Sequence, residues 1–512
     1  MNKSCLSCSM LALLVFGSFA KAQDSVQGKE PIDPTIDVAK LKYDYLVDGN
    51  LPQDDPAHKK FKTLQAAYAA APEGTEQNPT VIGIEPNVYQ LPGGDRVPSM
   101  EINKNWITFL GLTNNRRSVV LADNRGLSEG SGDDGYMLMV NCTGFAAKNL
   151  TMLNYCNCDY EYPGDPSKNL KMRNPTITQA VALQSQGDKQ VYENVALLSR
   201  LDTMFLRTTR SYFNNVFIEG TDDFIGGGQV SYWEDCEVVF PTGHGVMSAS
   251  GVVFVNTKFE STRGMRFSKG PGRPVALIDC TMPVNTPENI VAWIRGKAPP
   301  RPNLLYLTYH TKDASGQPAV IVDSSQGPPT FTYSRELSDQ EALAFNPWNI
   351  LRSPPAGAAD DWDPSGTKEK YEAAGQGSLI YRMALTNGIA SIRTGGAGVT
   401  IGAAVQPIRV ADSSIKWSTP SELIILNRTT GPNVVVTGNN KTDKPQYVPV
   451  TATAANGYYV TAYVFVEPRY TDPPAITASR YVCTCSNCPS SNPTKHVDAF
   501  ARLAGSQAMA MA

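Results

Sequence analysis

Two aspartates occupy equivalent positions in a sequence repeat, where they could perform acid–base or nucleophilic chemistry. Asp202 follows Asn194 by eight residues, and Asp223 follows Asn215 by the same interval. Because the two asparagines are 21 residues apart, a repeating structure would place both carboxylates on one face, one above the other. Neighbouring strands of a sheet lie roughly 4.8 Å apart, so the two side chains should be close together.

Two carboxylates at this separation influence each other's ionisation. At about 5 Å and an effective dielectric near 20 they repel by roughly 3 kcal/mol, which corresponds to about two pKa units. Either one carboxyl stays protonated and can donate a proton, or a cation keeps a carboxylate ionised as a nucleophile. Arg266 is the candidate cation, because it follows Asp223 by 43 residues, close to two repeats. Gln179, 23 residues before Asp202, could donate a hydrogen bond to an oxygen that gains charge during acyl transfer.

The repeat also predicts the fold that positions these residues. Its units are centred on an Asn or Asp between β-favouring residues, and the centres are 45, 21, 20, 21 and 23 residues apart. They are Asn149, Asn194, Asn215, Asp235, Asn256 and Asp279. This period predicts a right-handed parallel β-helix, in which Asn side chains stack and satisfy backbone groups at the corners. We interpret the first gap as about two repeats with a polar insertion near residues 159–173. Accidental periodicity in a β-sandwich is the alternative.

The segments on either side of the repeat predict the domain organisation. Residues 61–70 have the pattern of an amphipathic helix, which would cover the N-terminal end of the coil. Short strands separated by turns between residues 423 and 466 favour a β-sandwich that weakly resembles bacterial immunoglobulin-like domains. The predicted all-β chain has a signal peptide (1–22), a β-helix domain (40–351), a linker (352–376), an immunoglobulin-like β-sandwich (377–468) and a flexible tail (469–512).

Composition and the N-terminus limit the partners and the location. With 512 residues, a net charge of −3 and a pI of about 5.9, the chain lacks the basic field of a nucleic-acid-binding protein. The apolar run from Met10 to Phe19, followed by Ala20-Lys21-Ala22, is typical of a secretory signal and too short to span a membrane. We therefore expect a soluble protein exported to the periplasm or the medium.

Several other residues carry a functional and a simpler interpretation. Arg263, Lys269 and Arg273 could contact an anionic polymer or be ordinary surface charges. The run Gly226-Gly227-Gly228 lacks the Lys-Ser/Thr of a phosphate loop and favours a tight turn or a close backbone approach to a ligand. Stacked aspartates can form a mere surface ladder, and Asp222 and His244 are typical of turns. Cys236 and Cys280 are expected to be buried thiols. Cys483, Cys485, Cys488 and His496 could bind zinc, although the usual paired spacing of a zinc site is missing.

Three segments resemble the signature blocks of pectin methylesterases, in order and at the expected spacing. They are Gln179–Leu183, Leu201–Phe205 and Glu219–Ile225. Residues 61–74, 86–89 and 337–349 also look like their counterparts, so the resemblance covers about residues 40–351.

The resemblance implies a right-handed parallel β-helix that removes methyl groups from esterified polygalacturonate. It implies that Asp223 is the nucleophile, that Asp202 is the general acid and base, that Arg266 orients Asp223, and that Gln179 stabilises the oxyanion. It implies no metal and no other cofactor. The candidate substrate contacts are Phe205, Phe224, Phe267, Lys269 and Arg263, the expected partner is pectin, and the expected state is a monomer.

The chain departs from the family pattern around these residues. Leu201 stands where the family has a glutamine, which removes one expected oxyanion donor, and such a loss can cost roughly 10²–10³ in rate. Arg266 is followed by Phe267-Ser268 instead of Pro-Trp, and Gly226 replaces an aromatic residue. We therefore predict a divergent esterase. A non-catalytic glycan-binding β-helix, or a lyase or glycosidase acting on pectin, are the alternatives.

Overall fold

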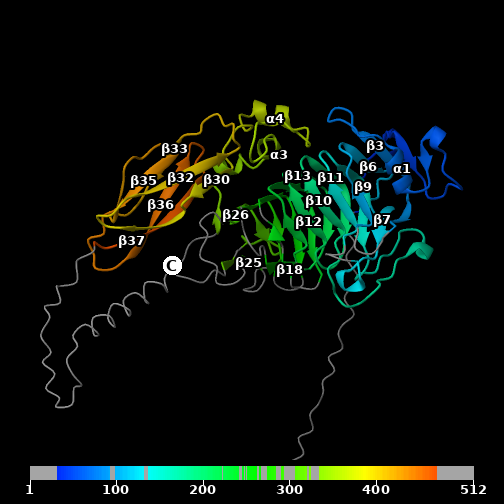
Figure 1. Cartoon of the computed structure of the whole chain (residues 1–512), viewed down its shortest axis with the longest axis horizontal. Helices are drawn as coiled ribbons and strands as arrows, with labels where there is room; N and C mark the ends of the chain where they lie inside the picture. Colours follow the sequence, from blue (N-terminus) through cyan, green and yellow to red (C-terminus); the bar gives the residue numbers. More distant parts are fainter. Residues whose placement is uncertain are drawn as a thin grey trace, which may run out of the picture. The chain divides into compact units, whose positions relative to one another are not determined.

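The computed structural model describes most of the chain between residues 31 and 469 (Figure 1). The residues not described in this range are 93–97, 132–135, 222, 242–244, 247, 250, 262–264, 267–273, 284–289, 293–305, 320–321 and 324–333. The predicted signal peptide, the tail beyond residue 469 with its cysteines, Asp222 and His244 lie outside the described residues. The described residues up to Pro468 belong to one compact unit.

Residues 45–336 wind into successive coils of parallel β-strands. Every strand pairing in the three sheets of this region is parallel, and many paired residues are about 21 positions apart, as Leu183 with Met204 and Met204 with Ile225. A chain that pairs in parallel with itself at this short interval must complete one turn between the paired strands. The predicted parallel β-helix is therefore confirmed.

The strands of the coils fall into three sheets among the described residues. The 19-stranded sheet contains β1 (Tyr45–Val47), β2 (Lys60–Phe61), β3 (Thr80–Ile84), β4 (Asn87–Gln90), β6 (Ile107–Gly111), β7 (Val119–Asp123), β9 (Ala146–Asn154), β11 (Gln190–Leu198), β13 (Arg210–Asn214), β14 (Phe217–Glu219), β16 (Val230–Glu234), β17 (Glu237–Phe240), β20 (Val252–Val255), β21 (Lys258–Ser261), β23 (Val275–Ile278), β24 (Thr281–Met282), β26 (Tyr306–Tyr309), β27 (Lys312–Asp313) and β29 (Ser334–Glu336). The six-stranded sheet contains β5 (Met100–Ile102), β8 (Leu138–Asn141), β10 (Leu183–Gly187), β12 (Met204–Thr208), β15 (Ile225–Gly227) and β19 (Ser248–Ala249). A four-stranded sheet contains β18 (Gly245–Val246), β22 (Met265–Arg266), β25 (Ile290–Ala292) and β28 (Val322–Asp323).

The repeated Asn and Asp residues form one corner of the coil. All six centres of the repeat have positive φ angles, between 45° and 58°, a left-handed conformation that Asn and Asp tolerate better than most residues. Asn194 Nδ2 donates to Asn149 Oδ1 at 3.2 Å, and Asn215 Nδ2 donates to Asn194 Oδ1 at 3.3 Å. The predicted ladder exists, and these amides satisfy one another as well as the backbone.

The first gap of the repeat differs from the expectation. β9 pairs directly with β11, with Leu150 opposite Val195, so the 45-residue gap is a single coil that carries an insertion and not two repeats. The insertion contains a short 3-10 helix (Pro166–Lys168). Its Cys158 and Tyr160 are buried in a cluster with strand residues such as Leu153 and Leu198. Because the insertion packs on the outer side of the coil, it adds residues without adding a turn.

A helix and an apolar interior complete the N-terminal part. α1 (Leu64–Ala70) lies within the predicted helix and begins after Thr63, whose hydroxyl accepts a hydrogen bond from Ala66 N. Its Leu64 and Ala67 are buried in the same core as the inward residues of the coils. Cys236 and Cys280 are buried free thiols of this core, as predicted.

Two four-stranded sheets follow the coils. The connecting region contains α2 (Asp339–Ala342), α3 (Pro347–Leu351) and α4 (Lys368–Ala373). One sheet contains β30 (Arg382–Thr386), β32 (Val399–Gln406), β34 (Ile424–Leu426) and β35 (Asn433–Gly438), and the other contains β31 (Ile389–Arg393), β33 (Ile415–Ser418), β36 (Gln446–Ala454) and β37 (Tyr459–Glu467). Strand pairs are antiparallel except β31 with β37. The strands predicted between residues 423 and 466 are present, and both sheets contribute to one apolar cluster.

The predicted linker is packed against the coils. Arg210, the first residue of β13, is completely buried, and its guanidinium binds the carboxylates of Asp188 and Asp360 at 2.6–3.0 Å. Trp362 lies beside the same guanidinium, 5.3 Å from ring centroid to Cζ. Residues 352–376 thus make specific contacts, while the predicted domain boundaries and the immunoglobulin-like assignment stay predictions.

Candidate active site

Asp202 and Asp223 lie at the same point of consecutive coils. Each stands two residues before one member of the pair Met204 and Ile225, which are opposite each other in β12 and β15. Met204 N also donates to Phe224 O at 3.0 Å. The 21-residue register therefore brings the two aspartates to neighbouring positions on the coil, as the sequence predicted.

Both aspartates have an uncommon backbone conformation. Their φ angles are 61° at Asp202 and 49° at Asp223, and they belong to a different corner from the Asn ladder. A non-glycine residue in this region is uncommon and often occurs where a side chain must be aimed in a particular direction. Asp202 is 8% exposed, and Asp223 is half-buried. The carboxyls thus belong to a partly desolvated site.

Gln179 lies on the preceding coil, with a register that differs from the expected one. Its backbone forms a parallel bridge with Leu201, not with Asp202, so the interval is 22 residues there and 21 residues at Leu183 and Met204. The half-buried side chain of Gln179 is therefore anchored one position before the acid/base candidate. Leu201, the residue that replaces the family glutamine, is its direct neighbour.

Arg266 is on the second coil beyond Asp223. It belongs to β22, where it pairs with Val246 of β18, and Ser248, two residues further along, pairs with Gly226 of β15. The backbone of Arg266 therefore lies two coils beyond that of Asp223, as the interval of 43 residues predicted. The side chain of Arg266 and the whole of Arg263, Phe267 and Lys269 lie outside the described residues, so their roles stay predictions.

The two candidate aromatic contacts have different environments. Phe205 is half-buried and lies against Gly226 of the next coil, where a Cβ atom would be only 2.7 Å from Cδ1 of the phenyl ring. The ring thus occupies the space that the missing side chain at Gly226 leaves. Phe224 is 0% exposed and packs edge-to-face on Phe240, with ring centroids 4.9 Å apart. Phe224 is therefore a core residue, which corrects the expectation that its ring contacts substrate.

Asn154 connects the coil of Gln179 to the coil before it. This completely buried side chain donates from Nδ2 to Arg125 O at 2.9 Å and to Val181 O at 3.2 Å. Its Oδ1 accepts from Arg125 N at 3.1 Å and from Cys156 N at 3.3 Å. One amide therefore fixes three chain segments, among them the one that carries Gln179. One sign of this junction was visible in the sequence: a polar residue ends an apolar strand.

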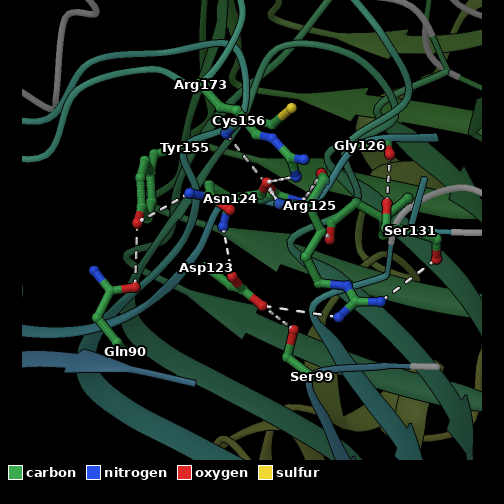
Figure 2. A network of polar contacts seen from close by, with 12 residues as sticks. Gln90, Ser99, Asp123, Asn124, Arg125, Gly126, Ser131, Tyr155, Cys156 and Arg173 are labelled. Carbon is green, nitrogen blue, oxygen red and sulfur yellow. Dashed lines mark hydrogen bonds and ion pairs between the residues drawn. The ribbon is translucent and has the colours of Figure 1, made fainter. Parts of the chain in front are cut away.

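A loop beside Asn154 holds Gln179 from the other side; Figure 2 shows Asn124, Arg125 and Gly126 of this loop. Leu127 N donates to Gln179 O at 3.0 Å, and Ser128 N donates to Thr178 Oγ1 at 3.1 Å. The loop is fixed by Arg125, whose guanidinium lies between the Asp123 carboxylate, 4.0 Å away, and Ser131 O, 3.4 Å away. This polar network positions the backbone at Gln179.

Arg173 joins the insertion to the same loop. Its guanidinium donates to Asn124 O and Glu129 O at 3.5 and 3.3 Å and lies 3.4 Å from the Glu129 carboxylate. The insertion therefore supports the loop that contacts Gln179. Sequence reasoning placed the insertion but missed this function.

A buried ion pair lies next to both aspartates in the sequence and was also missed. Arg200 Nη1 is 3.5 Å from Glu219 Oε1, and their side chains are 7% and 1% exposed. Burial raises the pKa of Glu219 to about 7, and the charge of Arg200 opposes this shift. The available signal was a charged residue after each of two apolar runs: Glu219 directly follows residues 216–218, and Arg200 follows residues 195–198 after one serine.

Known proteins resemble the region that contains this site. A family model described as Pectinesterase matches residues 53–258. Pectinesterase 1 of Citrus sinensis is 28% identical over 179 residues, which cover 35% of this chain and 26% of that protein. The pectinesterase of Ralstonia nicotianae is 26% identical over 247 residues, 46% of this chain and 49% of that protein. Residues 53–258 belong to the pectinesterase family.

Solved structures of pectin methylesterases align with a larger part of the chain. The enzyme from Yersinia enterocolitica aligns with a TM-score of 0.33 and 23% identity, covering 56% of this chain and 97% of that one. A pectin methylesterase mutant in complex with hexasaccharide IV aligns with a TM-score of 0.39 and 21% identity, covering 64% and 99%. The chain spans only about a quarter of the citrus pectinesterase. No helix among the described residues has the length and apolarity needed to cross a membrane.

Proposed function

We propose that this protein is a carbohydrate esterase that hydrolyses methyl esters of galacturonate in pectin and releases methanol. The observation that carries the proposal is the register of Asp202 and Asp223, which stand at equivalent left-handed positions of adjacent coils, inside a segment of the pectinesterase family. A pair of adjacent carboxyls with different environments can divide the roles of nucleophile and proton donor.

The proposed reaction uses the two aspartates in turn. The Asp223 carboxylate attacks the ester carbonyl carbon, and an amide N–H of Gln179 stabilises the oxyanion that forms. Asp202 then gives its proton to the departing methoxide, which leaves as methanol. In the second half, Asp202 takes a proton from water, which attacks the acyl-enzyme and frees Asp223 and the galacturonate carboxylate.

The other parts of the proposal concern the surroundings of the site. Arg266 keeps Asp223 ionised, and Phe205 with Arg263, Phe267 and Lys269 contacts the polymer. The N-terminal segment directs export to the periplasm or the medium. There the protein acts on pectin as a monomer. The absence of a glutamine at Leu201 predicts a slower reaction than in enzymes that have this donor.

Methanol release from methylated pectins tests the proposal. We expect release by the wild-type protein, and we expect Asp223→Asn to lower kcat by at least about 10³-fold. Asp235→Asn is the matched control, because Asp235 is also an aspartate with positive φ, but it lies in the Asn ladder and should retain wild-type activity.

Two results would contradict the proposal. Failure of the wild-type protein to release methanol from every pectin tested, with retained pectin affinity in gel electrophoresis, would favour a glycan-binding β-helix. Formation of new reducing ends or unsaturated products would instead indicate a glycosidase or a lyase, because an esterase leaves the chain length unchanged.

A further inference from the structure

The Arg200–Glu219 pair is costly to bury, so its position requires a reason. Two charges removed from water lose hydration energy that their attraction only partly restores. The pair is not fully satisfied either, because Arg200 Nη1 and Glu219 Oε2 have no hydrogen-bond partner among the described residues. Such a pair is weak evidence for stability and stronger evidence for a specific local arrangement.

Two threonines close in sequence to Asp202 and Asp223 donate hydrogen bonds to the backbone carbonyls of the two charged residues. Thr221 donates to Arg200 O from its backbone N at 2.6 Å and from its hydroxyl at 2.7 Å. Thr203 Oγ1 donates to Glu219 O at 2.7 Å. Each threonine thus binds the other coil's charged residue, and all four residues are buried. Asp202 lies between Arg200 and Thr203, and Asp223 follows Thr221 by two residues.

We infer that Arg200 and Glu219 are positioning residues that, through Thr203 and Thr221, hold Asp202 and Asp223 in their left-handed conformations on adjacent coils. The inference rests on the proposed function, because it treats the two aspartates as the reacting groups. Neither Arg200 nor Glu219 needs to touch substrate for this role. A displacement of about 1 Å in a reacting group can change a rate by up to about 10²-fold.

The surroundings of the pair determine when it is charged. Burial raises the pKa of Glu219 to about 7. The insertion contributes Cys158, whose thiol pKa is raised by burial, and Asp159, which is paired with Lys171 at 2.9 Å. Neither Cys158 nor Asp159 supplies a positive charge that could lower the pKa of Glu219. As the pH falls through about 7, Glu219 takes up a proton, and Arg200 loses its counter-charge.

Kinetics of Glu219→Gln test the inference, because the amide resembles the protonated acid at every pH. We expect kcat to fall about tenfold or more, with KM unchanged within about twofold. The wild-type kcat should decrease as the pH falls through about 7, and this decrease should be absent from the variant. Glu341→Gln is the control, because it breaks another buried pair, Arg335–Glu341 at 2.6 Å, and should change stability without changing kcat.

Two further measurements cover variants that fold poorly and a protein that proves inactive. The double variant Arg200→Met/Glu219→Met removes both charges and retains apolar packing, so it should fold and show the same loss of kcat. Amide hydrogen exchange needs no activity: residues 200–203 and 219–223 should exchange faster in Glu219→Gln than in wild type. If the wild-type protein is inactive but this exchange difference is observed, the result contradicts the proposed function and leaves the positioning role intact. Wild-type kinetics and exchange in Glu219→Gln would overturn the positioning role.

Discussion

Asp202 and Asp223, the proposed reacting groups, have a backbone conformation that few residues tolerate. The repeat in the sequence predicted their adjacency, since a 21-residue interval is visible without a structure. Their positive φ angles were not predictable, because Asp tolerates this conformation without requiring it, and tertiary contacts decide where it occurs. The one-residue shift of Gln179 and the burial of Phe224 were also beyond the sequence, since both depend on how the chain enters a strand.

Substitutions at Asp202 should separate the conformational role from the chemical one. Both Asp202→Asn and Asp202→Ala should abolish methanol release, because neither side chain can donate and accept the proton. Asn tolerates left-handed backbone better than Ala, so Asp202→Ala should lower the free energy of unfolding by about 1–2 kcal/mol more than Asp202→Asn does. Urea unfolding measures this difference. Equal stability of the two variants would show that the conformation at Asp202 imposes no strain.

At the scale of elements, the site depends on how three coils are joined. The sequence predicted the coils from their periodicity and placed the insertion near residues 159–173. It did not show that the insertion belongs to a single turn, because a gap of 45 residues is close to two periods. The hydrogen bonds of Asn154 and Leu127 join segments 27 to 52 residues apart, and no local pattern reveals such partners.

Asn154→Asp should disturb the site through this junction. The variant replaces the Nδ2 amide group, which donates two buried hydrogen bonds, by a carboxylate oxygen that faces the carbonyls of Arg125 and Val181, which should cost about 2–3 kcal/mol of unfolding free energy. It should also lower kcat, because Gln179 shares the segment that Asn154 anchors. Methanol release, normalised to the folded fraction, measures the effect.

Asn349→Asp is the control for this prediction. Asn349 is also completely buried, and its Nδ2 donates to Ala344 O and Leu379 O at 2.8 Å. The substitution should cost similar stability in α3 without changing kcat. Equal effects of the two substitutions on kcat would mean that Asn154 has no particular connection to the site.

At the scale of the molecule, the coils and the following sheets share an apolar cluster. It includes Tyr232 and Val253 from the outer face of the coils, Phe345 just before α3, Leu351 at the end of α3, and Trp417 of β33. Composition predicted a separate linker at residues 352–376, because Pro, Gly and Ala are frequent there. It could not show that one buried arginine in β13 binds this segment, since the partners are 150 residues apart.

Asp360 should make the attachment of this segment dependent on pH. Burial acts to raise the pKa of Asp360, but hydrogen bonds and charges from Arg210 and Lys189 outweigh it and lower the pKa to about 2. A carboxyl with a lowered pKa stabilises the folded state above its unfolded pKa of about 3.8 and loses this contribution as the pH falls toward about 2. Asp360→Asn should therefore be less stable than wild type at pH 6, and the difference should shrink between pH 4 and pH 2. Urea unfolding across this range measures it.

Since the Asp360 side chain is 36% exposed, solvent screening reduces the effect. Asp361→Asn is the control, because this neighbouring carboxyl is 53% exposed and pairs with Lys368, so the substitution should change the free energy of unfolding less than Asp360→Asn does. A constant difference between wild type and Asp360→Asn from pH 6 to pH 2 would mean that the ionised carboxylate does not hold this segment to the coils.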